Sequence, residues 1–271
     1  LFPYTTLFRS MAFTVHAVMP GVWHIVDCMG VCMTLLEGEN AAMLVDTGYG
    51  IEDVADFMRH MTDLPLTVFL THNHHDHAMG ARCFPETYML EADMADWRMF
   101  TDDKMRRRVL TQAIGKNLPV DEKTFLAGEI PLPKVMKPGV IDLGGLTAEI
   151  IEAPGHTPGS AVVYVPERKL LLSGDDWNPC TWLFFPQALG LREYRSNMRG
   201  IQQLPFEKVL CPHREALYDR WMFDDFFNAL TDGNLRAAEP VNIAPYEQID
   251  TCQATLPHDQ VLVFDWAKSG L

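Results

Sequence analysis

The chain has 271 residues, with 36 acidic against 22 basic side chains, and its formal net charge of −14 goes with a pI of about 5.0. An acidic surface repels phosphate backbones, so we expect no nucleic-acid partner. Hydrophobic residues make up 48% of the sequence and charged residues 21%, which excludes a disordered chain and predicts a globular protein.

Neither a membrane span nor an export signal is visible in the sequence. No apolar run approaches the roughly 20 residues that cross a bilayer, so we expect no membrane partner. Because no basic stretch is followed by an apolar segment and a cleavage site, we expect a cytoplasmic protein whose six scattered cysteines stay reduced.

The first ten residues match what a widely used sequencing-adapter oligonucleotide encodes in one reading frame. We therefore interpret residues 1–10 as a non-native leader and expect a single domain over residues 11–271, beginning at Met11. A genuine N-terminal arm is the alternative.

The first third of the chain predicts an antiparallel opening, one helix and a buried strand. Apolar and β-branched stretches at 21–26, 31–37 and 42–46 are typical of strands joined by short turns. A glycine-containing loop follows, and residues 51–61 predict a helix because their apolar side chains recur at helical spacing. Residues 66–70 form a short apolar run that predicts the next strand.

Four histidines and one aspartate follow that strand within the six positions 72–77. A helix can begin at Ala78, so the group is expected on a strand-to-helix loop, where α/β proteins carry much of their chemistry. Imidazole and carboxylate are preferred ligands of first-row metals. The spacing allows His72 and His74 to face one cation while Asp76 and His77 turn toward a second. A solvated loop with chance histidines is the alternative, but the chain has only ten histidines in all.

Residues 88–90 predict a short strand, after which the sequence becomes charged and methionine-rich. We expect one or two helices between 91 and 114, broken near Thr101, and then an irregular connector over 116–138 that contains four prolines. Residues 91–138 are therefore expected to be a helical insertion that forms a lid or a substrate wall, or the contact of a homodimer.

The second half of the chain predicts two hairpins, two helices and further strands. A Gly-Gly turn divides the hairpin expected at 139–152, and a second hairpin is expected at 161–173. The helices are expected at 187–204 and 215–230, and the strands at 208–210 and 260–265.

Five short motifs resemble, in this order, those of the metallo-β-lactamase superfamily. They are L-V-D-T-G at 44–48, H-x-H-x-D-H at 72–77, A-P-G-H-T-P-G-S at 153–160, L-L-S-G-D at 171–175 and V-L-C-P-H at 209–213. The resemblance implies an α+β fold, the αββα four-layer sandwich, in which two mixed β-sheets are flanked by helices, here with a helical insertion.

The resemblance also implies two divalent metal ions. His72, His74 and His156 would hold one ion, Asp76, His77 and His213 would hold the second, and Asp175 would bridge them. Zinc (Zn2+) is the expected metal, with iron or manganese as alternatives. Asp46 would orient a ligand histidine, and Asp176 is the alternative bridge. His75 is expected to be a surface group, or to support the site without binding an ion.

A centre of this kind implies a hydrolase. Two divalent ions share a water molecule and lower its pKa, so that a metal-bound hydroxide attacks a lactone, ester, thioester or amide. Asp76 would orient the hydroxide and later carry a proton. The alternatives are an iron-dependent sulfur dioxygenase or another redox member of the fold, a non-catalytic binding protein, and a phosphodiesterase, which the acidic charge disfavours.

An aspartate at position 175 is similar to the pattern of the hydroxyacylglutathione hydrolases and N-acylhomoserine lactonases. True β-lactamases of the superfamily tend to have cysteine or serine near that position. Asn178 stands where the lactonases have a tyrosine, and no basic C-terminal patch resembles the glutathione-ester hydrolases, so no subfamily is assigned. The aromatic residues of 177–185 predict an apolar substrate wall, with a dimer contact or core packing as the alternatives. The expected partner is a small-molecule, apolar acyl substrate.

Overall fold

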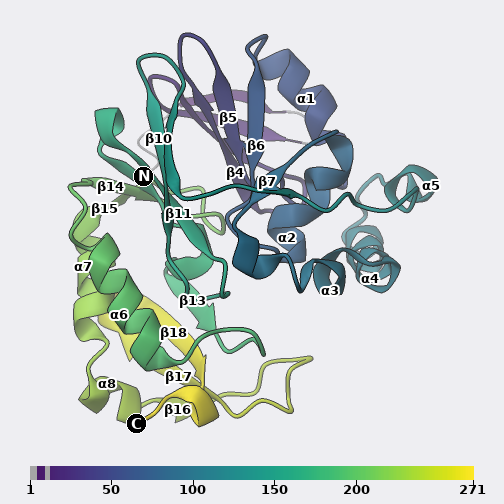
Figure 1. Cartoon of the computed structure of the whole chain (residues 1–271). Helices are drawn as coiled ribbons and strands as arrows, with labels where there is room; N and C mark the ends of the chain where they lie inside the picture. Colours follow the sequence, from purple (N-terminus) through teal and green to yellow (C-terminus); the bar gives the residue numbers. More distant parts are fainter. Residues whose placement is uncertain (1–4, 10–12) are drawn as a thin grey trace.

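A computed structural model describes residues 5–9 and 13–271, and it contains three β-sheets with helices outside them (Figure 1). Of the residues interpreted as a leader, 1–4 and 10 lie outside the described residues, while 5–9 form a strand at the edge of a sheet. The origin of this segment stays a prediction. Within the described ranges, the helices include none with the length and apolar character that a bilayer span requires.

The first sheet has eight strands that follow one another in chain order. They are β1 (Thr5–Arg9), β2 (Thr14–Met19), β3 (Val22–Val26), β4 (Cys32–Glu37), β5 (Ala42–Val45), β6 (Leu66–Phe69), β7 (Tyr88–Met89) and β8 (Lys134–Val135). The strands from β1 to β5 pair antiparallel, and those from β5 to β8 pair parallel. Val45 lies opposite Phe69, so Asp46 and the histidine cluster leave the sheet at the same edge.

The second sheet has six strands in the order β15-β14-β12-β11-β10-β9. They are β9 (Gly139–Asp142), β10 (Thr147–Glu152), β11 (Ala161–Val165), β12 (Leu170–Leu172), β14 (Lys208–Leu210) and β15 (Tyr218–Asp219). The parallel strands β12 and β14 place Leu172 opposite Leu210. Asp175 and His213 each follow their strand by the same number of residues, so the pairing brings two distant motifs to one edge.

A third sheet forms from the C-terminal region and the aromatic stretch, in the order β13-β18-β17-β16. Its strands are β13 (Cys180–Leu183), β16 (Glu239–Pro240), β17 (Thr251–Leu256) and β18 (Gln260–Asp265). The strand predicted at 260–265 is confirmed as β18. The other three go beyond the prediction, because β13 has no apolar alternation of its own and finds its parallel partner β18 about eighty positions away.

Alternating side chains of the two larger sheets build four layers. In β11, Val163 packs toward the first sheet, whereas Val162 packs toward helices on the outside. The outer face of the first sheet is covered by α1 (Val54–Met61), and that of the second by α6 (Leu191–Ile201) and α7 (Arg220–Ala229). The αββα sandwich with two mixed sheets is therefore confirmed.

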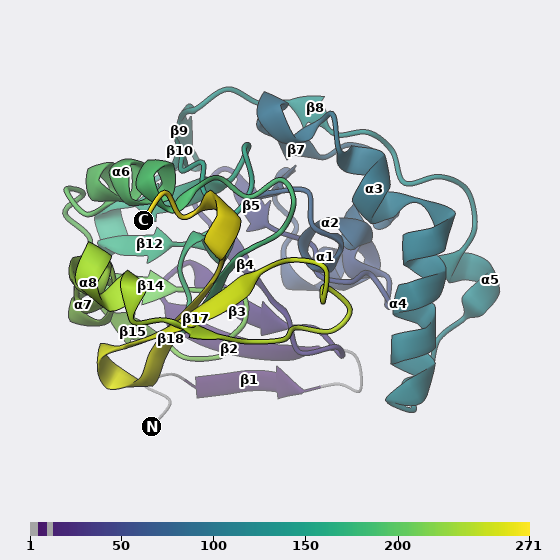
Figure 2. The ribbon, with the colours of Figure 1, turned by 90° about the horizontal axis from the view of Figure 1, so that it is seen from below.

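Helices between β7 and β8 lie together at one end of the molecule (Figure 2). They are η2 (Glu91–Asp93), α3 (Trp97–Thr101), α4 (Asp103–Gly115) and α5 (Glu122–Phe125). The break predicted near Thr101 is confirmed, because Asp102 ends α3 and its carboxylate accepts a hydrogen bond from the Met105 N–H as the N-cap of α4. Trp97 is buried in one cluster with Ala78, so the helices pack directly against the histidine-rich loop.

Several elements differ in extent from the prediction. A short helix, α2 (His75–Ala78), begins inside the histidine cluster rather than after it. The helix predicted at 187–204 begins only at Leu191, and the one predicted at 215–230 begins at Arg220 because β15 first pairs with β14. The connector is not wholly irregular, since it contains α5 and β8. The remaining short helices are η1 (Met79–Cys83), η3 (Pro166–Arg168), η4 (Gly174–Asp176), α8 (Asp232–Arg236), η5 (Pro257–Asp259) and η6 (Trp266–Lys268).

Candidate metal centre

Four loops that carry the predicted ligands meet at one edge of the two larger sheets. The histidine cluster follows β6, the His156 loop joins β10 to β11, and Asp175 and His213 follow β12 and β14. The Ala161 N–H donates to the Thr71 carbonyl at 3.0 Å, which ties the second loop to the first. The pairing of the strands therefore fixes the positions of the loops from which these side chains extend.

The seven predicted ligands form three overlapping groups, in each of which the donor atoms lie within 4.8 Å of one another. The groups are His72, His74 and His156; His72, His77 and Asp175; and Asp76, His77 and His213. Asp175 lies between the others: its Oδ2 is 3.4 Å from His77 Nε2 and 3.5 Å from His156 Nε2, and its Oδ1 is 3.0 Å from His213 Nε2. The structure thus brings all seven side chains together, and their roles as ligands stay a prediction.

Three of the histidines are held by the ring nitrogen that faces away from the centre. His77 Nδ1 lies 3.0 Å from Asp46 Oδ2, as expected for a carboxylate that orients a ligand. His156 Nδ1 lies 2.6 Å from the Trp182 carbonyl oxygen, and His72 Nδ1 lies 3.1 Å from a threonine hydroxyl. Such partners set the tautomer, and they leave the opposite nitrogen, Nε2, free to bind a cation.

His74 is turned the other way. Its Nδ1 lies 2.8 Å from His156 Nε2, and its Nε2 lies 3.1 Å from the side-chain amide of Gln187. The Gln187 atom at this distance is the amide nitrogen, so if Nδ1 binds a cation and Nε2 carries the proton, the amide must turn its carbonyl oxygen toward Nε2 to accept it. Sequence reasoning does not find Gln187, because a glutamine 113 positions from its partner carries no local signal.

Buried atoms at the centre lack hydrogen-bond partners in a way that suits a metal. His72 Nε2, His77 Nε2 and Asp175 Oδ1 are all buried and have no well-aligned hydrogen bond, although Asp175 Oδ1 lies within ion-pair distance of His213 Nε2. A buried polar atom without a partner costs about 1–3 kcal/mol, so three such atoms facing one another suit a cation bound between them. A divalent cation would satisfy all three, and the nitrogen and oxygen donor set fits zinc, iron or manganese.

Burial and charge separate the histidines into two sets. Burial lowers the pKa values of His72 and His74 well below the usual range, and neighbouring imidazoles lower them further. These two rings are therefore neutral at neutral pH, as a ligand must be. Burial acts in the same direction on His77 and His213, but the neighbouring carboxylates, Asp175 first and then Asp76, together outweigh it and raise the pKa of both.

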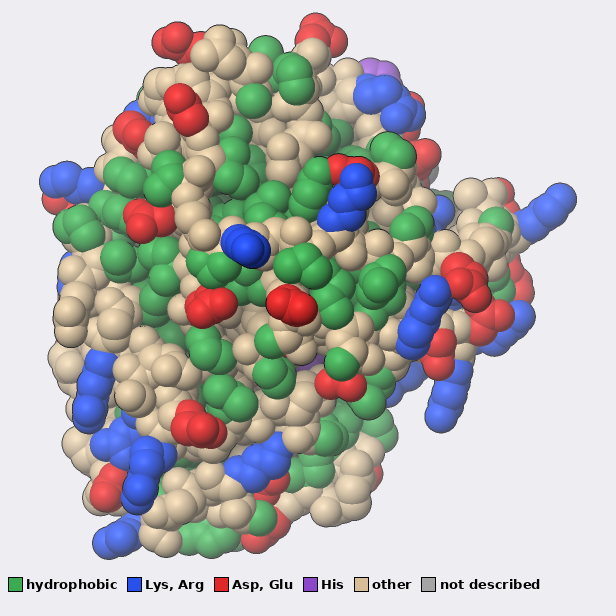
Figure 3. Space-filling model, viewed as in Figure 1, with side chains coloured by type: hydrophobic (Ala, Val, Ile, Leu, Met, Phe, Trp, Pro, Cys, Tyr) green, Lys and Arg blue, Asp and Glu red, His purple; other side chains and the backbone are tan. Residues whose placement is uncertain are grey.

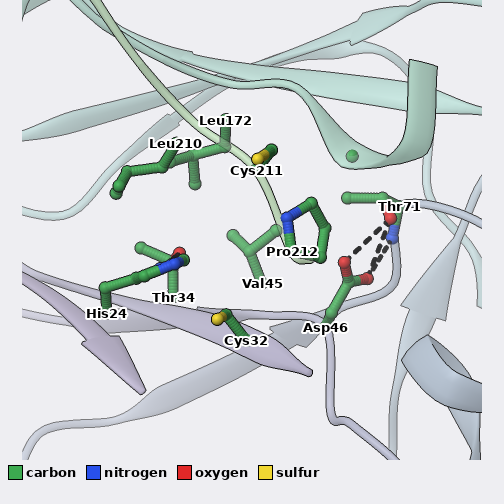
Figure 4. A pocket seen from close by; sticks show the side chains of 11 residues that line it. His24, Cys32, Thr34, Val45, Asp46, Thr71, Leu172, Leu210, Cys211 and Pro212 are labelled. Atoms are coloured by element: carbon green, nitrogen blue, oxygen red, sulfur yellow. Dashed lines mark hydrogen bonds between the residues drawn. The ribbon is translucent and has the colours of Figure 1, made fainter. Parts of the chain in front are cut away.

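Asp46 is fixed between the two larger sheets. Its φ of 64° is left-handed, a conformation that aspartate tolerates better than most residues. Its carboxylate accepts hydrogen bonds from the backbone N–H of Thr71 at 2.7 Å and from the Thr71 hydroxyl (Figure 4). The cavity drawn there, lined also by His24 and Cys211, has a volume of about 10 Å³, which suits about one water molecule and no substrate.

Asp93 joins the two histidine loops and was not expected to do so from the sequence. Its buried carboxylate accepts hydrogen bonds from the Gly159 N–H at 2.6 Å, the Thr157 hydroxyl at 2.7 Å and the Asn73 N–H at 3.2 Å. The His156 loop is thereby fastened to the histidine cluster. An aspartate in a charged segment has no feature that would reveal this role in advance.

His75 and Asp176 lie beside the centre but belong to none of the three groups. His75 lines the cleft above the centre, with its Nδ1 3.7 Å from Asp76 Oδ1. Asp176 accepts a hydrogen bond from the His156 N–H at 2.9 Å, and burial raises the pKa of its carboxyl group well above the usual range. Asp175, and not Asp176, is therefore the carboxylate that faces the histidines.

A cleft of about 470 Å³ opens over the centre, between the inserted helices and loops of the C-terminal region. The aromatic stretch contributes to it in part. Trp177 is buried in the core and donates to Gln260, whereas Trp182 is 37% exposed and lines the cleft together with Phe185. The cleft is lined by aromatic side chains together with polar and charged ones. Figure 3 shows hydrophobic side chains across the middle of one face of the molecule, with acidic and basic side chains among them.

Comparison with known proteins identifies relatives of this arrangement. The profile of the family described as Metallo-beta-lactamase superfamily matches residues 26–213, which contain all seven predicted ligands. The chain is 26% identical over 202 residues to a chicken (Gallus gallus) protein named acyl-coenzyme A thioesterase MBLAC2, which covers 66% of this chain and 70% of that protein.

Solved structures with this architecture include a beta-lactamase domain protein from Burkholderia ambifaria. It has a TM-score of 0.61 and 18% identity over 86% of this chain and 78% of that chain. The sec-alkylsulfatase Pisa1 from a Pseudomonas species also has a TM-score of 0.61, with 17% identity over 82% of this chain and 42% of that chain. At such identities the likeness concerns the fold alone.

Proposed function

Because the chain belongs to the metallo-beta-lactamase superfamily, we propose that it is a metal-dependent hydrolase of a small acyl compound, with an acyl thioester as the substrate class. The observation that carries the proposal is the group of imidazoles and carboxylates with unpaired donor atoms at the base of an aromatic cleft. The chicken relative, named a thioesterase, favours a thioester over a lactone, an oxygen ester or an amide.

We assign the ligand roles by the three groups of donor atoms. His72, His74 and His156 would hold one divalent cation, Asp76, His77 and His213 a second, and Asp175 would contact both. When bound there, the cations supply Lewis acidity and a water molecule of lowered pKa. Zinc is the proposed metal, because it combines readily with imidazole and carboxylate ligands.

Asp76 is suited to move a proton during the reaction. Burial alone would raise the pKa of its carboxyl group, but the nearby histidines, His77 first, lower it to about 2. The group is therefore ionised at neutral pH, so it can orient the attacking water and accept its proton. It can then return a proton to the departing sulfur.

Tyr49 lines the same cleft and is suited to donate a hydrogen bond. Burial, and then the negative charge of Asp76, raise the pKa of its phenol, so the hydroxyl stays protonated at neutral pH. A protonated phenol at this place can stabilise negative charge that develops on the carbonyl oxygen of the substrate. Phe100, Trp182 and Phe185 would hold the acyl chain and exclude water.

The proposal is tested by elemental analysis followed by a hydrolysis panel on the same preparation. The panel contains acyl thioesters, lactones, oxygen esters and β-lactams. We expect zinc in the protein and thioester hydrolysis that is lost in Asp175→Asn but retained in Asp142→Asn. The control makes the same chemical change at an exposed residue at the end of β9.

Two outcomes would contradict the proposal. One iron per chain without hydrolysis would favour the sulfur dioxygenase. A pure protein that takes up no transition metal would remove the basis for any metal-dependent reaction.

A further inference from the structure

The cleft over the metal centre has an aromatic side next to His74 and His156. The ring centroid of Phe100 lies 4.5 Å from that of His74, and the ring of Phe185 lies 4.8 Å from His74 and 5.4 Å from His156. Tyr246, from the loop between β16 and β17, packs on Phe185 at 5.4 Å. An acyl chain is therefore best accommodated on this side.

The opposite side of the cleft, next to Asp76 and His213, is cationic. Arg214 follows His213 directly, and its guanidinium donates to the His213 carbonyl at 2.9 Å. Arg108 of α4 lies near His75: burial lowers the pKa of His75, and the positive charge of Arg108 acts in the same direction. No other arginine or lysine lines the cleft among the described residues.

Both guanidinium groups are available to a ligand. Arg108 and Arg214 are exposed, and neither lies in an ion pair with any residue that the structure describes, whereas Arg195 and Arg220 do. The carboxylates that line the cleft, Asp76 and Asp175, are turned to the histidines. The chain has a net charge of −14, so its electrostatic potential is negative on average, and the two unpaired arginines make the cleft locally positive.

We propose that Arg108 and Arg214 form a subsite for an anionic group in the thiol half of the substrate. The inference rests on the proposed function and deepens it. If the acyl chain occupies the aromatic side, the carbonyl carbon lies over the centre and the sulfur-bearing half extends toward the arginines. The substrate is then an amphipathic thioester with an apolar acid and a thiol that carries phosphate or carboxylate groups. Guanidinium recognises both anions by charge-assisted hydrogen bonds.

Binding of thioethers that cannot be hydrolysed tests the subsite independently of catalysis. S-decyl-coenzyme A carries phosphates, S-decylglutathione carries carboxylates, and S-decyl-N-acetylcysteamine is neutral, while all three share one alkyl chain. Dissociation constants are followed by tryptophan fluorescence and calorimetry on the metal-loaded protein. The variants are Arg108→Gln and Arg214→Gln, and the control is Arg107→Gln, an exposed arginine of the same helix that does not line the cleft.

We expect at least one anionic thioether to bind about tenfold more tightly than the neutral one, with the preference weakening as salt is added. Each cleft variant should weaken the preferred anionic ligand about fivefold and leave the neutral ligand within about twofold, as expected for an exposed charge pair. Arg107→Gln should change neither. The coenzyme A and glutathione arms show which anion the subsite prefers.

Equal affinity of the unmodified protein for all three thioethers would overturn the inference, as would equal effects of Arg107→Gln and Arg108→Gln. The corresponding decanoyl thioesters, assayed in parallel, separate this result from the proposed function. Failure to hydrolyse any of them would refute the thioesterase assignment, while the binding comparison would still decide the role of the arginines.

Discussion

Replacement of Asp46 by asparagine tests whether the far nitrogen of a histidine controls the metal centre. Asp46 Oδ1 accepts from the Thr71 backbone N–H at 2.7 Å, a donor that cannot turn away. An asparagine must therefore keep its carbonyl oxygen at that position and place its NH2 group at the Oδ2 position. That position lies 3.0 Å from His77 Nδ1.

The NH2 group donates a hydrogen bond, so His77 Nδ1 must become the acceptor and its proton must move to Nε2. Nε2 is the atom that faces Asp175 at 3.4 Å, and a protonated Nε2 cannot bind a cation. Changes of this kind beside a metal ligand typically weaken metal binding about 10- to 100-fold, which corresponds to ~1.4–2.8 kcal/mol. The left-handed backbone at this position is no obstacle, since asparagine adopts it readily.

The measurement is zinc affinity by competition with a chromophoric chelator, together with thermal unfolding of the metal-free protein to show that the variant folds. The control is Asp53→Asn, which makes the same change at the exposed N-cap of α1, where asparagine caps as well as aspartate. A variant at Asp46 that binds zinc within about twofold of the unmodified protein would refute the tautomer argument.

Three further predictions concern the loops, the cleft and the titration of the centre. In Asp93→Asn, the new NH2 group must face at least one of the three groups that donate hydrogen bonds to the carboxylate. This should lower the free energy of unfolding of the metal-free protein by about 2 kcal/mol and its Tm by about 4–8 °C, and an unchanged Tm would contradict it. Trp182→Ala should remove ~1–2 kcal/mol of apolar contact with a long acyl chain and so lower kcat/KM for long-chain thioesters about 5- to 30-fold, with little change for an acetyl thioester. A variant that keeps its preference for long chains would exclude Trp182 from substrate binding. Against the effect of burial, Asp175 and Asp76 together raise the pKa values of His77 and His213 above 6.5. In the metal-free protein their protonated forms therefore stabilise the fold at low pH, and this contribution is lost as pH rises through the raised values. Zinc binding near pH 7 should then release about one or two protons per chain, measured by calorimetry in buffers of different ionisation enthalpy, and no release would show that both rings are already neutral.

Much of the candidate centre was predictable because its proposed ligands lie in short motifs beside apolar strands. His72 to His77 follow β6 directly, and Asp175 and His213 follow β12 and β14. A strand fixes the position and direction of the loop that leaves it, so local sequence is enough to place such residues at one edge of a sheet. The break between α3 and α4 was predictable for a similar reason, since its capping residue Asp102 is adjacent in the chain.

Contacts between distant segments were not predictable. Gln187 lies 113 positions from His74, and Asp93 lies 64 positions from Thr157, and nothing in either short stretch distinguishes these side chains from surface residues. The division of the aromatic stretch between core and cleft follows from the parallel pairing of β13 with β18, which turns Thr181 inward and exposes part of Trp182.

The sequence by itself determined the family resemblance, the four layers and the identity of the seven side chains, because each is encoded by residues close together in the chain. Only the tertiary structure decided which nitrogen of each histidine faces the centre, which carboxylate fastens the loops, and which side of the cleft carries Arg108 and Arg214. Those properties depend on hydrogen bonds and packing between segments that meet only after folding, and their geometry has no counterpart in local sequence pattern.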